Sequence, residues 1–202
     1  METTITGSLV RPLRAADRKP AARAAGFTLL ELLITMSVAT ILLTIAIPSF
    51  QYVTNSNRIA GEVNGLLGDL QFARSEAIKE GQYVSVCASS DGQSCSNSPD
   101  WQSGWIVFVN PNNSPTVTPG LSMLPLLRLQ SAFWGTDSFV SNGISIITFN
   151  RDGYAGGMAS GTIIILHDLT GNSAWTRCAS IAPSGEVTTE QSGTTSNGVT
   201  CT

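Results

Sequence analysis

The longest apolar stretch of the chain lies near its start, from Phe27 to Ile47. These 21 residues carry one charge, on Glu31. As a helix the stretch is about 31 Å long, which matches the hydrocarbon thickness of a bilayer. The sequence therefore predicts a transmembrane helix over residues 27–47.

After this stretch the chain becomes polar but keeps a helical period. Apolar residues recur every three or four positions, at Val63, Leu66, Leu70, Ala73 and Ala77, as in a helix with one face packed on a domain. Pro48 removes one backbone hydrogen bond and is predicted to bend the helix where it leaves the bilayer. Gly81 is a plausible cap, so the predicted helix covers Phe27 to Glu80.

From Gln82 onward the pattern is typical of strands. Apolar and β-branched runs bounded by Gly, Asn, Asp, Ser and Pro occur at residues 83–88, 104–110, 144–150, 161–168, 176–182 and 185–190. Surface loops are expected at 91–100 and 110–120. The pattern indicates an α+β fold with the long helix lying across an antiparallel sheet. The expected division is 1–26, then the helix 27–80, then a β-rich globular domain 81–202.

Composition and charge agree with a membrane segment followed by a domain outside the cytoplasm. Apolar residues make up 42% and charged residues only 12%, about half of the usual charged fraction. The first 26 residues carry a net charge of +3 and the remaining 176 residues carry −6. The basic segment would stay in the cytoplasm, with everything after Pro48 on the other side. The acidic body argues against nucleic-acid binding.

The four cysteines indicate disulfides rather than a metal site. No CxxC spacing occurs, and the single histidine, His167, lies far from every cysteine in the sequence. An even cysteine count beyond a membrane segment favours two disulfides in an oxidising compartment. Of the three possible connectivities, we expect Cys87 with Cys95 and Cys178 with Cys201, because each closes a short loop. No metal or cofactor is expected.

Glu31 requires an explanation, because a carboxylate within an apolar span costs several kcal/mol unless it has a partner. A cut between Gly26 and Phe27 would create an α-amino group four residues before Glu31. That cation could pair with the carboxylate of its own or of a neighbouring subunit. An ordinary secretory signal, with an apolar region of roughly 7 to 15 residues, and a plain uncut anchor are the alternatives. Neither accounts for Glu31.

These residues resemble the class III signal of type IV prepilins: a basic leader ending in Gly26, then Phe27, an apolar stretch with Glu31, and Pro48. The resemblance implies cleavage after Gly26, N-methylation of Phe27 by a prepilin peptidase, and use of Glu31 to register the subunit in a filament. The 26-residue leader departs from the pattern, since it is long for this type.

The rest of the chain is similar to the GspH/FimT family of minor pilins and pseudopilins. The similarity is carried by residues 64–81, a Cys-containing strand followed by Asp-Gly and Cys95, WxxGWIVF at 101–108, and ITFNRDGYA at 147–155. It implies a pilin fold in a non-enzymatic subunit, anchored in the inner membrane with a periplasmic globular domain. The subunit would prime or cap a type IV pilus or a type II secretion pseudopilus. Its partners would be other major and minor pilins or pseudopilins.

Some relatives act in DNA uptake through a GRxR motif near the C-terminus. The aligned residues here are Gly185, Glu186, Val187 and Thr188, so both arginines are missing and one position is acidic. This change reverses the local attraction for phosphate. A DNA-binding role in natural transformation is therefore only the alternative hypothesis.

Four further groups of residues have a structural and a functional interpretation. Arg74, Ser75 and Glu76 either form a partner-binding patch or hold the helix end against the first strand. Trp101 and Trp105 fit the core better than a ligand site. Residues 150–153 predict a tight hairpin turn, with Arg151 a weak functional candidate. His167 and Asp168 do not suffice for a hydrolytic site, since no GxSxG elbow accompanies them.

Overall fold

A computed structural model describes residues 26–110, 125–133, 137–156, 161–167, 172–196 and 198–202. Leader residues 1–25, most of the loop expected at 110–120, and Asp168 lie outside the described residues. The chain forms two compact units, one up to Ile45 and one covering Ala46–Thr202. Each unit is described by itself below.

One helix, α1 (Leu29–Glu80), forms as expected and differs from the predicted range by two residues at its start. Its end is capped by Gly81, whose φ of +66° is readily adopted by glycine. The Gln82 N–H donates to the Ala77 carbonyl at 3.2 Å, as in a Schellman cap. The helix continues on both sides of Pro48, so a bend at this residue stays a prediction.

The second unit contains two antiparallel sheets. The first has the order β3-β2-β1-β5-β6, and the second has the order β4-β7-β8-β9. The strands of the first sheet are β1 (Val84–Ala88), β2 (Gly104–Val109), β3 (Leu126–Ser131), β5 (Ile146–Phe149) and β6 (Ala155–Gly156). Those of the second are β4 (Ser138–Ser141), β7 (Thr162–His167), β8 (Arg177–Ile181) and β9 (Val187–Gln191). A small hairpin pairs β10 (Thr195–Ser196) with β11 (Val199–Thr200).

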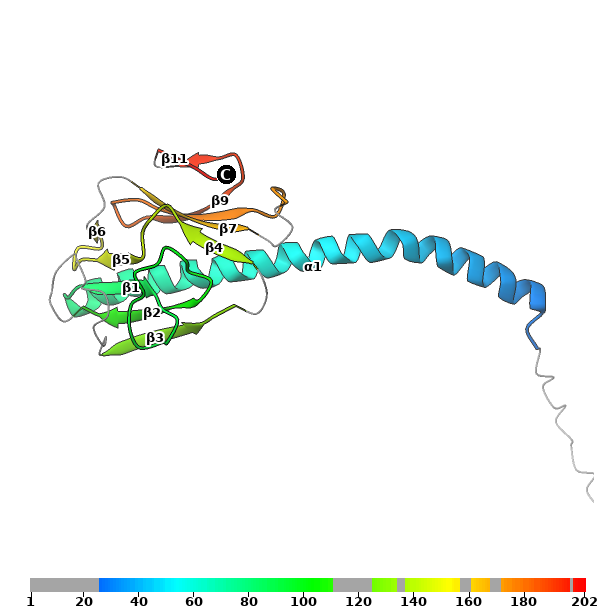
Figure 1. Cartoon of the computed structure of the whole chain (residues 1–202), viewed down its shortest axis with the longest axis horizontal. Helices are drawn as coiled ribbons and strands as arrows, with labels where there is room; N and C mark the ends of the chain where they lie inside the picture. The colour runs from blue at the N-terminus through cyan, green and yellow to red at the C-terminus, as the bar shows by residue number, and fades with distance from the viewer. Residues whose placement is uncertain (1–25, 111–124, 134–136, 157–160, 168–171, 197) are drawn as a thin grey trace, which may run out of the picture. The chain divides into compact units, whose positions relative to one another are not determined.

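The predicted α+β fold is confirmed. The six predicted strands correspond to β1, β2, β5, β7, β8 and β9, whereas β3, β4, β6, β10 and β11 were not predicted. Figure 1 shows the C-terminal part of α1 running alongside both sheets. The antiparallel sheet expected from the sequence is thus split into two, and both contribute to one core.

The core forms where one face of α1 meets the inner faces of the sheets. The buried helix residues are Ile59, Val63, Leu66, Leu70, Ala73 and Ala77. They pack in one cluster with Val86 of the first sheet and Ile164 of the second. Trp101 and Trp105 are 0% and 1% exposed, as expected for core residues. Burying an aromatic side chain of this size is among the largest single apolar contributions to a core.

Both expected disulfide pairs are present. Cys87 of β1 is bonded to Cys95, with 5.6 Å between the Cα atoms. Cys178 of β8 is bonded to Cys201, with 5.9 Å between the Cα atoms. The second bond fastens the C-terminal end of the chain to the outside of the second sheet, next to Ile163.

Candidate functional site

The first turn of α1 holds the residues for which a processing and assembly role is predicted. Gly26 and Phe27 precede the helix, and the Thr28 hydroxyl accepts a hydrogen bond from the Glu31 N–H at 3.2 Å. Thr28 is thus the N-cap and Glu31 the third helical residue, the spacing of a capping box. A carboxylate here is also favoured by the helix dipole. The start of the helix is therefore a favourable local environment for the Glu31 carboxylate. The Thr-x-x-Glu spacing, visible in the sequence, was a signal of this N-cap.

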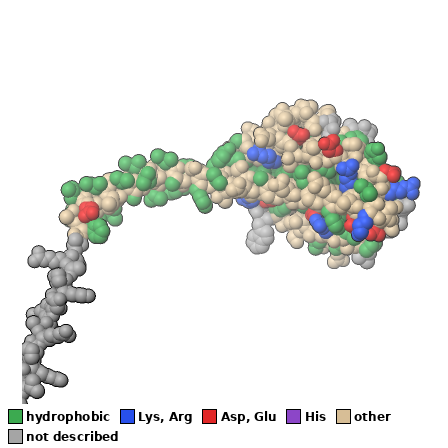
Figure 2. Space-filling view, turned by 180° about the vertical axis from the view of Figure 1, so that it is seen from behind, with side chains coloured by type: hydrophobic (Ala, Val, Ile, Leu, Met, Phe, Trp, Pro, Cys, Tyr) green, Lys and Arg blue, Asp and Glu red, His purple; other side chains and the backbone are tan. Residues whose placement is uncertain are grey.

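The segment from Phe27 to Ile47 exposes an apolar surface that the described residues do not cover. Phe27 and Leu29 are 83% and 82% exposed, and the large apolar residues that follow, up to Ile47, are all about half exposed or more. Figure 2 shows hydrophobic side chains along the visible face of this part of the helix. The segment is long and apolar enough to cross a membrane. Lipid or neighbouring helices must cover it.

Hydroxyl groups within this segment are satisfied by the helix itself. The side chains of Thr35, Ser37, Thr40 and Thr44 donate to carbonyl groups three or four residues earlier, at 2.7 to 2.9 Å. In lipid, a polar group without a partner would cost several kcal/mol. These internal bonds remove that cost, so the four hydroxyls are compatible with the apolar span.

Arg74 joins the helix to two turns of the second unit. Its Nε donates to the Gly153 carbonyl at 2.9 Å, and its Nη2 donates to the Ser184 carbonyl at 3.3 Å. The prediction that this end of the helix is held against the first strand by Arg74, Ser75 and Glu76 is therefore wrong. The physical reason is the length of Arg74, which lets it reach past the helix to carbonyls 79 and 110 residues away in sequence.

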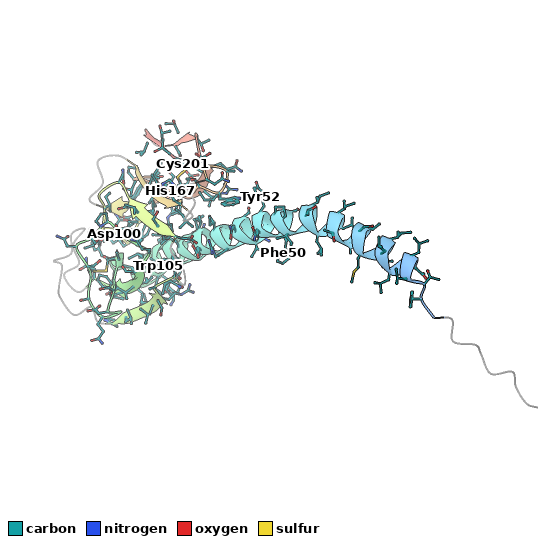
Figure 3. All side chains as sticks on the ribbon, turned by 45° about the vertical axis from the view of Figure 1, so that its right-hand side comes forward. Phe50, Tyr52, Asp100, Trp105, His167 and Cys201 are labelled. Carbon is teal, nitrogen blue, oxygen red and sulfur yellow. A yellow bond between two sulfur atoms is a disulfide. The ribbon has the colours of Figure 1, made fainter. Side chains whose placement is uncertain are left out.

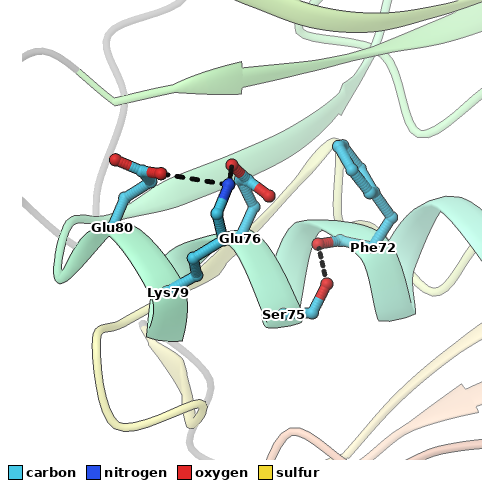
Figure 4. A network of polar contacts seen from close by, with 5 residues as sticks. All are labelled: Phe72, Ser75, Glu76, Lys79 and Glu80. Atoms are coloured by element: carbon cyan, nitrogen blue, oxygen red, sulfur yellow. Dashed lines mark hydrogen bonds and ion pairs between the residues drawn. The ribbon is translucent and has the colours of Figure 1, made fainter.

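The polar contacts that the structure gives for Ser75 and Glu76 lie within the helix. The Ser75 hydroxyl donates to the Phe72 carbonyl, and Glu76 pairs with Lys79 at 2.9 Å, with Glu80 also close to Lys79 (Figure 4). The side chain of Lys79 is 68% exposed, so this pair contributes little to stability. The two carboxylates raise the pKa of Lys79, chiefly through the hydrogen bond that Lys79 Nζ donates to Glu76.

The two turns reached by Arg74 touch each other. In the first, the Gly153 N–H donates to the Asn150 carbonyl at 2.9 Å, which confirms the hairpin turn predicted at 150–153. In the second, the Gly185 N–H donates to the Ala182 carbonyl at 2.8 Å. Both glycines have positive φ, +82° and +78°. A Cβ on Gly185 would overlap the Gly153 carbonyl oxygen. We call this contact of Arg74, Gly153 and Gly185 the turn junction.

The turn junction includes Gly185, the first of the residues aligned with the DNA-binding motif. Gly185 is fixed against Gly153, and the next residue is the acidic Glu186. The Arg74 guanidinium next to it already donates to two carbonyls. Arg151, in the same region, is exposed, and its role stays a weak hypothesis.

A second group of long-range polar contacts surrounds Asp69. One oxygen accepts from Trp105 Nε1 and the other from Arg128 Nη1, both at 2.9 Å. The Arg128 guanidinium also lies 3.7 Å from the centre of the Phe72 ring. This group was not predicted from the sequence. A signal for it was present in the sequence: Asp69 lies next to the apolar face of the helix that holds Leu66 and Leu70, where a carboxylate needs a partner.

Nearer the start of the second unit, Arg58 pairs with Asp137 at 2.9 Å, and the Asp137 side chain is only 2% exposed. Glu62 lies beside this pair. Burial raises the pKa of Glu62, the charge of Asp137 raises it further, and Arg58 opposes the shift. One oxygen of Glu62 and one of Asp137 are buried without a hydrogen-bond partner in the described part of the chain.

His167 Nδ1 contacts the Thr176 hydroxyl at 3.2 Å, which gives this histidine a structural partner. Within the described ranges, no group of three or more His, Cys, Asp or Glu residues is placed to hold a metal.

Comparison with known proteins agrees with this description. The model of the family described as type II transport protein GspH matches residues 62–185, and that of the prokaryotic N-terminal methylation motif matches residues 21–47. No curated protein sequence matches the chain.

Two crystal structures of the type IV minor pilin FimU from Pseudomonas aeruginosa are similar in fold. The P21 form has a TM-score of 0.50 at 22% identity and covers 70% of this chain and 92% of FimU. The P65 form has a TM-score of 0.48 at 23% identity and covers 66% and 91%. At these identities the similarity concerns the fold alone.

Proposed function

Because the chain belongs to the GspH family of minor pilins and pseudopilins, we propose that it primes or caps the assembly of a type IV pilus or a type II secretion pseudopilus. A prepilin peptidase cleaves it after Gly26 and methylates Phe27. The processed subunit waits in the inner membrane with its globular domain in the periplasm, where both disulfides are stable. It then enters the filament beside other pilins or pseudopilins. Its role is structural rather than enzymatic.

The observation that carries this proposal is the apolar, exposed first half of α1 with one carboxylate in its first turn. Cleavage turns Phe27 into the N-terminus and leaves its amine next to the helix end that Thr28 caps. The amine and the Glu31 carboxylate of an adjacent subunit then neutralise each other as the helices leave lipid and bundle. In a low-dielectric surrounding such a pair is much stronger than in water, so it favours one axial register between subunits.

The first test is mass spectrometry of the mature chain from membranes. The proposal requires a methylated phenylalanine, Phe27, at the N-terminus, and an N-terminus near Ala46 would overturn it. The second test compares Glu31→Ala with Thr35→Ala, an uncharged change one turn later on the same helix. We expect Glu31→Ala to be processed but lost from sheared filaments, and Thr35→Ala to be incorporated normally. Normal incorporation of both variants would refute the role of Glu31.

DNA uptake is the alternative function, and the observations favour it less. The chain after Gly26 has a net charge of −6, and the turn with Gly185 and Glu186 lacks the arginines of the motif. A gel-shift titration of the purified chain against salt separates the two functions. We expect weak binding at most, whereas tight binding that falls steeply with salt would favour DNA uptake.

A further inference from the structure

Two aromatic rings meet where the globular part of the chain begins. Tyr52 comes from α1, and Trp175 comes from the connection between β7 and β8. Their ring centres lie 5.5 Å apart, with 54° between the planes. Tyr52 is 50% exposed, and Phe50, two residues earlier, is 74% exposed. Figure 3 shows Phe50 and Tyr52 on different sides of the helix, so exposed aromatic groups lie on more than one side of it at this level.

The position of Tyr52 along the helix sets its depth. The predicted span ends at Ile47, and Tyr52 follows five residues later, about 7.5 Å further along the axis. The polar layer on each side of the hydrocarbon core is about 5 to 8 Å thick. Tyr52 and the ring that contacts it therefore lie at the level of the lipid headgroups. Tyr and Trp are the side chains enriched there, because they present an apolar body and a polar group.

The polar groups near Trp175 fit the same location. Its Nε1 is buried and has no hydrogen-bond acceptor among the described residues, although buried indole N–H groups usually have one. Two residues later, Arg177 Nη1 donates to the Ala174 and Thr176 carbonyls, both at 3.0 Å. No carboxylate in the described ranges forms an ion pair with Arg177. Among the described residues, the indole N–H thus has no acceptor, and the Arg177 guanidinium bonds to backbone carbonyls rather than to a carboxylate.

From these observations we infer that Tyr52 and Trp175 form a headgroup dock, which rests on the phospholipid surface of the membrane that anchors the chain. The rings lie among the headgroups, and Arg177 faces lipid phosphates, whose charge attracts it. The dock holds the globular unit at the membrane before assembly, and it separates from lipid when the subunit enters a filament. The inference concerns the membrane-anchored subunit before assembly. The headgroup dock can therefore be refuted while the proposed role in filament assembly remains valid.

The test is depth-dependent quenching of Trp175 in the full-length chain. The protein, with Trp134→Phe in all samples because Trp134 lies outside the described residues, is reconstituted in phosphatidylethanolamine and phosphatidylglycerol vesicles. A nitroxide is placed either on the headgroup or deep in the acyl chain. The emission lost on adding Trp175→Phe belongs to Trp175. We expect the headgroup nitroxide to quench this emission more strongly than the deep one.

A matched control moves the indole to the other end of the unit. Tyr154 is 57% exposed and follows the turn next to Ile78, about 45 Å beyond Ile47 along the helix. In the Trp175→Phe protein, Tyr154→Trp should be quenched by neither probe. If Trp175→Phe does not fold, the Trp134→Phe protein alone suffices, because Trp101 and Trp105 are buried. Absence of quenching at Trp175, equal quenching by both probes, or stronger quenching by the deep probe would each overturn the dock.

Discussion

Replacing Gly185 by alanine tests how much the turn junction contributes to the free energy of unfolding. A control is needed to subtract the cost of placing alanine at a positive φ. At Gly185 the added methyl group meets two obstacles. The backbone has a φ of +78°, which is unfavourable for alanine. The Cβ would also overlap the Gly153 carbonyl oxygen and lie 3.1 Å from Arg74 Nε. Since backbone cannot move aside as a flexible side chain can, the two turns must separate.

A control with only the first obstacle exists at Gly193. Its φ is +88°, and a Cβ there would have nothing within 4 Å. Alanine at this position should cost about 1 kcal/mol, the usual penalty for a left-handed conformation. Gly185→Ala adds the loss of the Arg74–Gly153 hydrogen bond, which involves a charged donor and is worth about 2 kcal/mol. We expect a total loss of about 3 kcal/mol for Gly185→Ala.

The assay is urea unfolding of the purified chain with its disulfides intact, followed by tryptophan emission. Both variants should keep the wild-type dependence of stability on urea, and the midpoint should fall about three times as far for Gly185→Ala as for Gly193→Ala. Adding Arg74→Gln should then change Gly185→Ala little, because the bond is already lost. Equal midpoint losses for the two glycine variants would refute the junction as an energetic contact.

Three further predictions concern other contacts. Replacing Cys178 and Cys201 by serine releases a loop with a sequence separation of 23 and should lower the unfolding free energy by about 3 kcal/mol, measured by urea unfolding. Asp69→Ala leaves Trp105 Nε1 and Arg128 without their acceptor and should cost about 2 kcal/mol, whereas Glu80→Ala, in an exposed pair, should cost under about 0.5 kcal/mol. Because the raised pKa of Glu62 makes the folded state bind its proton more tightly, the contribution of this residue is fully present below the unfolded pKa near 4.5 and is lost as pH rises through the folded pKa. Glu62→Gln should therefore raise the urea midpoint at neutral pH and flatten its fall with pH, and an unchanged profile would contradict this.

Sequence periodicity was sufficient for the elements whose side chains repeat regularly. The helix residues from Val63 to Ala77 that were predicted to face the domain are all buried, because burial on one face imposes a helical period. The strand β1 was predicted from a run of small and β-branched residues in which Ser85 is the one polar side chain, and every residue of it is buried. In β3 most residues are exposed and Arg128 interrupts the apolar run, so no strand pattern was visible.

The polar contacts could not be predicted for a different reason. The acceptors of Arg74 are backbone carbonyls, which every residue has, so the sequence does not mark them. Asp69 binds residues 36 and 59 positions away. Such contacts depend on how the sheets pack on the helix, which local patterns do not contain. By contrast, the N-terminal methylation motif could be recognised because Gly26, Phe27 and Glu31 lie close together in sequence.

The sharing of α1 between both sheets has a consequence for the order of folding. The helix is made first, yet its face from Ile59 to Ala77 is covered by strands as late as β8, which ends at Ile181. A ribosome that has produced only the helix and the first sheet leaves part of that face exposed to water. The core of the globular part is therefore completed only when the last strands to be synthesised pack onto the helix that was synthesised first.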